Sequence, residues 1–240
     1  MSVPGKIKSG MELGQLFDPR RPRRLFTIGD SHSAVMRFEP GVRVLHLGPV
    51  TMHRAGRPGE LVRLIARSAA GPSLAPHTDR VAGAVVRALI RSDDTFTCFF
   101  GEIDVRAHFA QHCEEYGGAT EQARALARRA AEATAALAAM TGARGAFASI
   151  TPPSGHLHDA DFPTSGSLEA RREWTILLNR ELEAASSALG LDFVDFHAAY
   201  TDAAGNLDRW RADDTVHVLP RYDDHIVAAL RDHDLFPVQP

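Results

Sequence analysis

Cysteine and net charge are both scarce in this sequence of 240 residues. It contains 2 cysteines, Cys98 and Cys113, which excludes a disulfide framework and a zinc site of four thiolates and fits a reducing compartment. The 27 Lys and Arg residues nearly balance the 30 Asp and Glu residues, leaving a formal charge of −3. A chain so balanced lacks the basic surface that nucleic acids and anionic membranes attract, so we expect neither as a partner.

Long apolar runs are also missing. No uninterrupted stretch approaches the roughly 20 residues that cross a bilayer, and residues 1–24 lack the apolar run of a signal peptide. We therefore expect a cytoplasmic protein. With 44% hydrophobic residues and no linker rich in Pro, Gly and Ser, the chain is predicted to form one domain over residues 1–240, in which residues 1–24 are an N-terminal extension.

Short apolar runs alternate with helical patterns along the chain. The predicted strands are residues 25–28, 42–47, 95–100, 145–150 and 191–196. The predicted helices are residues 59–70, 79–91, 120–141 and 167–189. Because parallel strands need crossover connections and helices supply them, this alternation predicts an α/β fold: a five-stranded parallel sheet with helices on both faces.

Glycines end three of these strands and mark one rim of the predicted sheet. Gly29, Gly48 and Gly101 each follow a predicted strand. In open parallel sheets, ligands bind outside the carboxyl ends of the strands, so the functional site is expected near these glycines. Residues 152–167, which carry Pro, Gly, Ser and two histidines, are predicted to form a long loop on the same side.

A serine follows the first predicted strand directly, in the motif Gly29-Asp30-Ser31-His32-Ser33. At a strand-to-helix turn the Ser31 hydroxyl faces the expected cleft, where helix amides stabilise negative charge. The alternative is helix capping, since Asp and Ser are favoured N-cap residues. The motif therefore predicts either a nucleophile or a cap.

A base for this serine is available near the other end of the chain, in Asp214-Thr215-Val216-His217. On one loop, Asp214 can accept the Nδ1 proton of His217 and leave Nε2 to take the Ser31 proton. The long separation in sequence is no obstacle, because folding brings such residues together. Taken alone, an Asp-x-x-His match also arises by chance in a chain with 12 histidines.

Together these blocks resemble the SGNH/GDSL hydrolase superfamily over about residues 25–220. The resemblance rests on Gly29-Asp30-Ser31-x-Ser33, Gly48, Gly101-Glu102-Ile103-Asp104 and Asp214-x-x-His217. It implies a flavodoxin-like three-layer α/β/α sandwich with Ser31 as nucleophile, His217 as base and Asp214 as the partner that orients it. The main-chain amides of Ser31 and Gly48 would donate to the oxyanion.

One block departs from the family pattern, which is Gly-x-Asn-Asp with an Asn side chain that donates to the oxyanion. Ile103 stands at the Asn position and cannot donate, and loss of one such donor costs roughly 10²–10³ in turnover. Arg106 is the nearest replacement, because a guanidinium stabilises an oxyanion or holds an anionic substrate group. The equally weighted alternative is an ion pair between Arg106 and Glu102 or Asp104.

Further polar side chains are expected along the same rim. The set predicted to bind substrate comprises Asp30, His53, Arg54, Glu102, Asp104 and Arg106. If Arg54 and Arg106 converge, an anionic or sugar-phosphate substrate is favoured, although most arginines in loops are simply solvated.

Metal and cofactor chemistry are not expected. His108 and His112 have the spacing of ligands on one helix face, and His156 and His158 are two residues apart. No Glu adjoins His108 to complete a metalloprotease motif, so no metal is assigned. Glycine-rich phosphate-binding motifs are absent as well, so no cofactor is required.

The sequence therefore predicts a serine esterase that cleaves an O-acyl ester of a sugar or small metabolite through an acyl-enzyme on Ser31. Two alternatives remain open. The same residues would form an acyltransferase if a second hydroxyl replaced water. The departure at Ile103 motivates the other alternative, a non-catalytic binding or accessory protein with the same fold.

Overall fold

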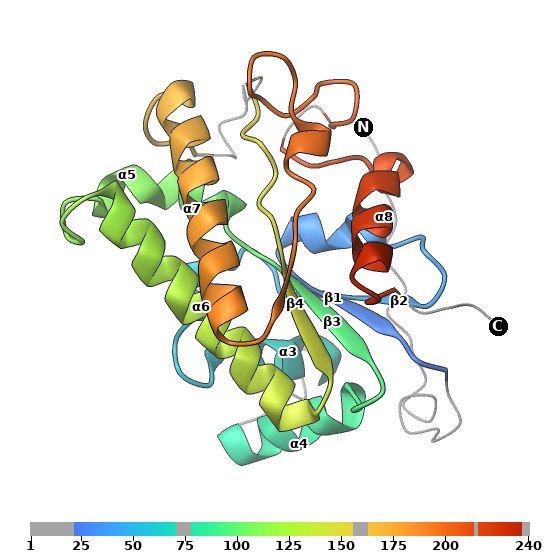
Figure 1. The fold of residues 1–240 in the computed structure, drawn as a ribbon. Coiled ribbons are helices and arrows are strands. Elements are labelled where there is room, and N and C mark those ends of the chain that lie inside the picture. The colour runs from blue at the N-terminus through green and yellow to red at the C-terminus, as the bar shows by residue number, and fades with distance from the viewer. Residues whose placement is uncertain (1–21, 71–77, 156–162, 214–215, 237–240) are drawn as a thin grey trace, which may run out of the picture.

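Five parallel strands form the central sheet of the molecule (Figure 1). The computed structural model describes residues 22–70, 78–155, 163–213 and 216–236. The strands are β1 (Leu25–Gly29), β2 (Val42–His46), β3 (Thr95–Phe99), β4 (Arg144–Ala148) and β5 (Asp192–Val194). β1 and β3 are buried at every position, as expected for apolar and β-branched strands covered on both faces.

The order of the strands across the sheet is β2-β1-β3-β4-β5, the order of flavodoxin-like folds. The chain therefore turns to one side after β1 and to the other side after β3, which leaves a crevice between them at their carboxyl ends. Gly29, the last residue of β1, is paired with His46 of β2 and Phe99 of β3. The segments that follow all three strands consequently begin at the same edge of the sheet.

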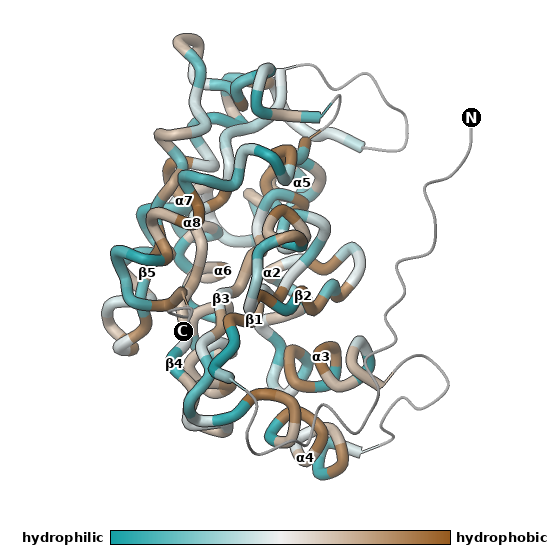
Figure 2. The backbone as a smooth tube through the Cα atoms, turned by 90° about the vertical axis from the view of Figure 1, so that its right-hand side faces the viewer, coloured by the Kyte–Doolittle hydropathy of each residue, from teal (hydrophilic) through white to brown (hydrophobic). Residues whose placement is uncertain are grey.

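Four helices cover one face of the sheet, and their apolar sides form one buried cluster with it. They are α3 (Glu60–Ala70), α4 (Asp79–Leu89), α6 (Ala119–Thr141) and α7 (Leu168–Ala188). Leu64, Val86 and Leu178, from three of these helices, are almost completely buried. Figure 2 shows apolar residues recurring along α3 and α4, as expected for helices with one side against a core.

The opposite face is covered by η1 (Ser31–Met36), a 3₁₀ helix, and by α8 (Asp224–Asp232). Met36, Ile226 and Leu230 pack there in a second buried cluster. The remaining helical segments are short: α2 (Met52–Ala55), the π-helical turn η3 (Asp104–His108), α5 (Phe109–His112), η4 (Ala198–Tyr200) and η5 (Pro220–Tyr222).

The predicted α/β/α sandwich with a five-stranded parallel sheet is confirmed, and each predicted strand and helix is present with ends shifted by a few residues. The strand-to-helix turn expected at Ser31 is present as the 3₁₀ helix η1, whereas the sequence patterns did not predict α8 or the helical turns after β3. Within the described ranges, no helix has the length and apolar character needed to cross a bilayer. Most of the extension predicted at residues 1–24 lies outside those ranges, as do residues 156–162 of the loop predicted at 152–167.

Candidate active site

Ser31 begins η1 at the carboxyl end of β1, where the crevice opens. The cap of this helix is Asp30, whose carboxylate accepts a hydrogen bond from the His32 amide. The Ser33 hydroxyl is buried and donates to the Asp30 carbonyl oxygen at 2.7 Å. Because Asp30 and Ser33 hold this turn, the hydroxyl of Ser31 takes no part in capping it and stays exposed.

The imidazole of His217 meets this hydroxyl although the two residues are 186 positions apart in the chain. Its Nε2 atom lies 2.7 Å from the Ser31 Oγ atom. Its Nδ1 atom lies 2.9 Å from a carboxylate oxygen of Asp213. A hydroxyl, an imidazole and a carboxylate are therefore hydrogen-bonded in series, with Nδ1–H donating to the carboxylate and Nε2 placed to accept from Ser31.

Among the described residues, the carboxylate beside His217 belongs to Asp213, which the sequence analysis did not single out. Asp213 lies four residues before His217, and its second carboxylate oxygen accepts the His217 amide at 3.1 Å. The Asp213 amide in turn donates to the His217 carbonyl oxygen at 2.9 Å. This closed loop fixes Asp213 against the ring, while Asp214 lies outside the described residues.

His32, next to Ser31, is a site residue that the sequence analysis did not identify. Its Nδ1 atom lies 3.1 Å from the Asp30 carboxylate, and its Nε2 atom lies 3.1 Å from the Val216 carbonyl oxygen. A carboxylate and a carbonyl oxygen both accept hydrogen bonds, so the imidazolium form, which has two N–H groups, satisfies both contacts at once. His32 therefore ties the turn after β1 to the residue that precedes His217.

The pKa of His32 reflects these contacts. Burial disfavours its charged form, but attraction to the Asp30 carboxylate and the hydrogen bond to it act more strongly together. The charge of Glu102 and the Val216 carbonyl add to them, and the pKa is raised to about 9. The His32 and His217 rings lie with their centroids 5.0 Å apart.

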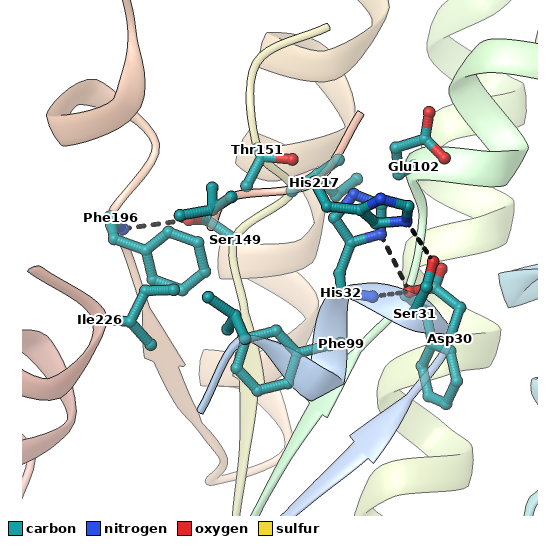
Figure 3. A pocket seen from close by; sticks show the side chains of 14 residues that line it. Asp30, Ser31, His32, Phe99, Glu102, Ser149, Thr151, Phe196, His217 and Ile226 are labelled. Atoms are coloured by element: carbon teal, nitrogen blue, oxygen red, sulfur yellow. Dashed lines mark hydrogen bonds and ion pairs between the residues drawn. The ribbon is translucent and has the colours of Figure 1, made fainter. Parts of the chain in front are cut away.

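A pocket of about 440 Å³, open mouth included, lies over these residues (Figure 3). Asp30, Ser31, His32, Glu102 and His217 line one side of it. Aromatic and aliphatic side chains line the other side, as Figure 3 shows for Phe99, Phe196 and Ile226. The remaining lining residues are Val35, Phe100, Ser149, Ile150, Thr151 and Val218. The pocket thus has a polar half beside Ser31 and an apolar half against the second core cluster.

Two of the six residues predicted to bind substrate, Asp30 and Glu102, line this pocket. The Arg106 guanidinium forms the ion pair that the sequence analysis gave as its alternative, with Nε 2.6 Å from a Glu102 carboxylate oxygen. Its Nη1 atom donates to the Pro163 carbonyl oxygen at 2.9 Å. Arg106 lines a smaller neighbouring pocket instead of the one over Ser31.

Asp104 does not reach the pocket, contrary to the prediction. Its carboxylate is buried and accepts the Met52 amide at 2.7 Å and the His53 amide at 3.4 Å, which fastens the start of α2 to η3. The pKa of Asp104 is raised to about 7, mainly by burial and also by the charge of Asp30, while the two amide hydrogen bonds act in the opposite direction. Its position is explained by this anchoring of the backbone.

His53 and Arg54 also do not line the pocket. The His53 Nε2 atom lies 3.2 Å from a guanidinium nitrogen of Arg57. Arg54 donates from Nε to Glu60 at 3.1 Å, beyond the end of α2. Arg54 and Arg106 each pair with a glutamate, so the convergence that would favour an anionic substrate is not found.

Of the two predicted oxyanion donors, Ser31 and Gly48, and of Ile103, which replaces the family's Asn, only Ser31 is at the pocket. Ser31 lines the pocket, whereas neither Gly48 nor Ile103 is among the residues that do. Gly48 has a φ of +78°, a left-handed conformation that glycine adopts freely. Ile103 is half-buried at the start of η3, so the family's Asn has no side-chain counterpart in the pocket lining.

Histidine pairs do not assemble a metal centre in the part of the chain that is described. There, no group of three or more His, Cys, Asp or Glu side chains is arranged to hold an ion. The rings of His108 and His112 have centroids 6.5 Å apart. His156 and His158 lie outside the described residues.

Comparison with known proteins finds similarity in structure. No protein-family model matches the sequence, and no curated protein matches it. A protein from Bacteroides fragilis named as an acylhydrolase superposes with a TM-score of 0.56 and 12% identity, covering 95% of this chain and 97% of that one. A GDSL-like lipase from Bacteroides thetaiotaomicron gives 0.52 and 16%, covering 88% and 87%. A Mycobacterium smegmatis aryl esterase gives 0.50 and 12%, covering 89% and 100%.

These likenesses extend over most of the chain at low sequence identity. The protein has the fold of the SGNH/GDSL hydrolases, and the resemblance predicted from its motifs is confirmed at that level.

Proposed function

We propose that this protein is a serine-dependent ester hydrolase with Ser31 as its nucleophile. One observation carries the proposal: the Ser31 hydroxyl lies 2.7 Å from His217 Nε2, and His217 Nδ1 lies 2.9 Å from Asp213. An unassisted serine is a poor nucleophile at neutral pH, and a hydrogen-bonded base oriented by a third group activates it. The structural neighbours named as an acylhydrolase, a lipase and an esterase support the same class of reaction.

In the first half of the proposed reaction, His217 removes the Ser31 proton as Oγ attacks the carbonyl carbon of the ester. Asp213 holds the ring with Nε2 toward Ser31 and stabilises the imidazolium that forms. The Ser31 amide, at the pocket, is proposed to stabilise the oxyanion, and the Gly48 amide is the second donor that the sequence motif suggests, although Gly48 does not line the pocket. His217 then protonates the departing alkoxide, which leaves an acyl group on Ser31.

In the second half, water attacks this acyl group after giving a proton to His217. The carbon–oxygen bond to Ser31 breaks, the free acid leaves, and Ser31 regains its proton from His217. We propose an O-acyl ester of a sugar or small metabolite as the substrate, because the pocket has a polar side beside Ser31 and an apolar side.

Labelling with a fluorophosphonate tests this proposal, because such reagents react with activated serines. The wild type should be labelled at Ser31, and Ser31→Ala and His217→Ala should not be labelled. Ser68→Ala, which removes a hydroxyl on α3 bonded to the His46 carbonyl oxygen, is the matched control and should be labelled like the wild type. Hydrolysis of short p-nitrophenyl esters should follow the same order.

Circular dichroism of each variant separates loss of chemistry from loss of folding. A folded wild type that takes no label and cleaves no ester would overturn the proposal in favour of a binding or accessory role.

A further inference from the structure

A second, smaller pocket of about 250 Å³, open mouth included, adjoins the one over Ser31. The two pockets share the lining residues Glu102, Ile150 and Thr151. Beyond these, the smaller pocket lies between η3, the start of α7 and the segment after β4, and its other lining residues are Val105, Arg106, Pro153, Ser154, Arg171 and Thr175. A substrate that fills the main pocket can therefore extend into the smaller one.

Three buried polar atoms of this lining have no hydrogen-bond partner among the described residues: Glu102 Oε2, Thr151 Oγ1 and Arg171 Nε. Thr151 is 7% exposed and Arg171 is 8% exposed. Buried polar groups in native proteins are almost always satisfied, so three such atoms around one pocket indicate that a polar ligand or water completes them.

The chemistry of the three atoms is complementary to hydroxyl groups. The Glu102 oxygen only accepts, the Arg171 Nε–H only donates, and the Thr151 hydroxyl does both. A hydroxyl can donate to one of these groups while it accepts from another.

An anionic ligand fits this lining less well than a neutral one. One Glu102 oxygen is already paired with Arg106, but the other would repel a phosphate or carboxylate placed beside it. Glu102 also attracts the Arg171 guanidinium, so part of the positive charge of Arg171 is already balanced. Neutral hydroxyl groups meet neither obstacle.

We infer that this smaller pocket binds hydroxyl groups on the alcohol part of the ester, so the substrate class is an acyl ester of a sugar or other polyol. The inference rests on the proposed function. The assignment to the alcohol part follows from the main pocket, whose apolar half, with Phe99, Phe196 and Ile226, suits an acyl chain (Figure 3). Glu102 and Thr151 then act as residues that determine specificity.

Two acetyl esters with different alcohols test this inference: an acetylated glucose and propyl acetate. The wild type should have a kcat/KM at least about tenfold higher for the sugar ester, because a lost hydroxyl leaves buried polar groups unpaired. Thr151→Val keeps the shape and removes the hydroxyl, and it should lower this ratio by about tenfold or more. Glu102→Gln should lower the ratio in the same direction.

In Thr151→Val, kcat/KM should fall more for acetylated glucose than for propyl acetate, because only the sugar ester has further hydroxyl groups that can bond to Thr151. Thr141→Val is the matched control; it removes a threonine hydroxyl at the end of α6 that donates to the Leu137 carbonyl oxygen. Its selectivity should be that of the wild type. Calorimetry adds a readout without turnover: acetylated glucose should bind Ser31→Ala more tightly than the double variant Ser31→Ala/Thr151→Val.

The outcomes separate the two proposals. If Ser31 is labelled but the wild type does not prefer the sugar ester, or Thr151→Val keeps the preference, the hydroxyl site is wrong and the hydrolase proposal stands. Preference for a phosphorylated alcohol over the neutral sugar would also overturn the site. If Ser31 takes no label, the hydrolase proposal fails. If Ser31→Ala and Ser31→Ala/Thr151→Val bind acetylated glucose equally well, the proposed hydroxyl site is wrong.

Discussion

Raising the pH through the titration of His32 is expected to loosen the loop that carries His217. The pKa of His32 rises from 6.5 to about 9 on folding. A group whose pKa is raised by folding stabilises the folded state fully below its unfolded pKa, and this stabilisation is lost as the pH rises through the folded pKa. Neutral His32 keeps one N–H, so it cannot donate to both Asp30 and Val216.

The size of the effect follows from the same shift. One pKa unit corresponds to about 1.4 kcal/mol, so protonated His32, which is 11% exposed, contributes about 3 kcal/mol at pH 6.5. About 2 kcal/mol remains at pH 7.5 and less than about 0.5 kcal/mol at pH 9. In a chain of this size, the loss between pH 6.5 and pH 9 lowers the melting temperature by about 5–10 °C.

Thermal denaturation of the wild type and His32→Gln at several pH values measures the stability that protonated His32 contributes. The variant has no group that titrates there, so its stability deficit should be largest at pH 6.5 and should shrink toward pH 9. His112→Gln, which changes an exposed histidine paired with Glu115, should show no such trend. An NMR titration of the His32 ring should have its midpoint near pH 9. A midpoint near 6.5, or parallel stability curves for wild type and His32→Gln, would refute the reasoning.

Three other substitutions have definite expected outcomes. Asp213→Asn should lower kcat by about 10³–10⁴ with little change in KM, because the ring loses its orienting carboxylate; steady-state kinetics should show a much smaller loss for Asp214→Asn. The difference in melting temperature between Asp104→Asn and the wild type should shift in favour of the variant from pH 5 to pH 8. Folding raises the pKa of Asp104 to about 7, so ionising this group costs the wild type stability as the pH rises. Ile103→Asn should change kcat less than about threefold, since position 103 does not line the pocket; a rise of tenfold would contradict this.

Local patterns were enough to predict the layers of the fold. Buried strands such as β1 and β3 appear in sequence as short apolar runs that stop at glycine, and α6 and α7 are long enough for their periodicity to be evident. α8 was missed because it has nine residues and few signals at its ends, although Ile226, Val227 and Leu230 are spaced as one helix face. The π-helical turn η3 has no sequence signature of this kind.

Site residues that belong to a sequence motif could be predicted, whereas residues whose role depends on a contact made on folding could not. Asp213 and Asp214 are adjacent residues of the same type, and the hydrogen bonds of Asp213 to the ring and main chain of His217 exist only in the folded chain. His32 belongs to the serine motif, but its role depends on the Val216 carbonyl, 184 residues away. Thr151 and Arg171 come from separate segments, and their shared pocket exists only after folding.

The charged residues of the site bear on the charges that form in the proposed reaction. Asp30 pairs with His32, and one oxygen of Glu102 pairs with Arg106, while the second Glu102 oxygen has no hydrogen-bond partner among the described residues. Asp213 is different, since its partner is a base that must be neutral before it accepts the Ser31 proton. When His217 becomes an imidazolium, that pair also becomes neutral and a negative charge forms on the substrate oxygen. Asp213 therefore opposes the new positive charge at His217, and the oxyanion is left to main-chain donors. The unpartnered Glu102 oxygen beside them favours a neutral ester over an anionic one.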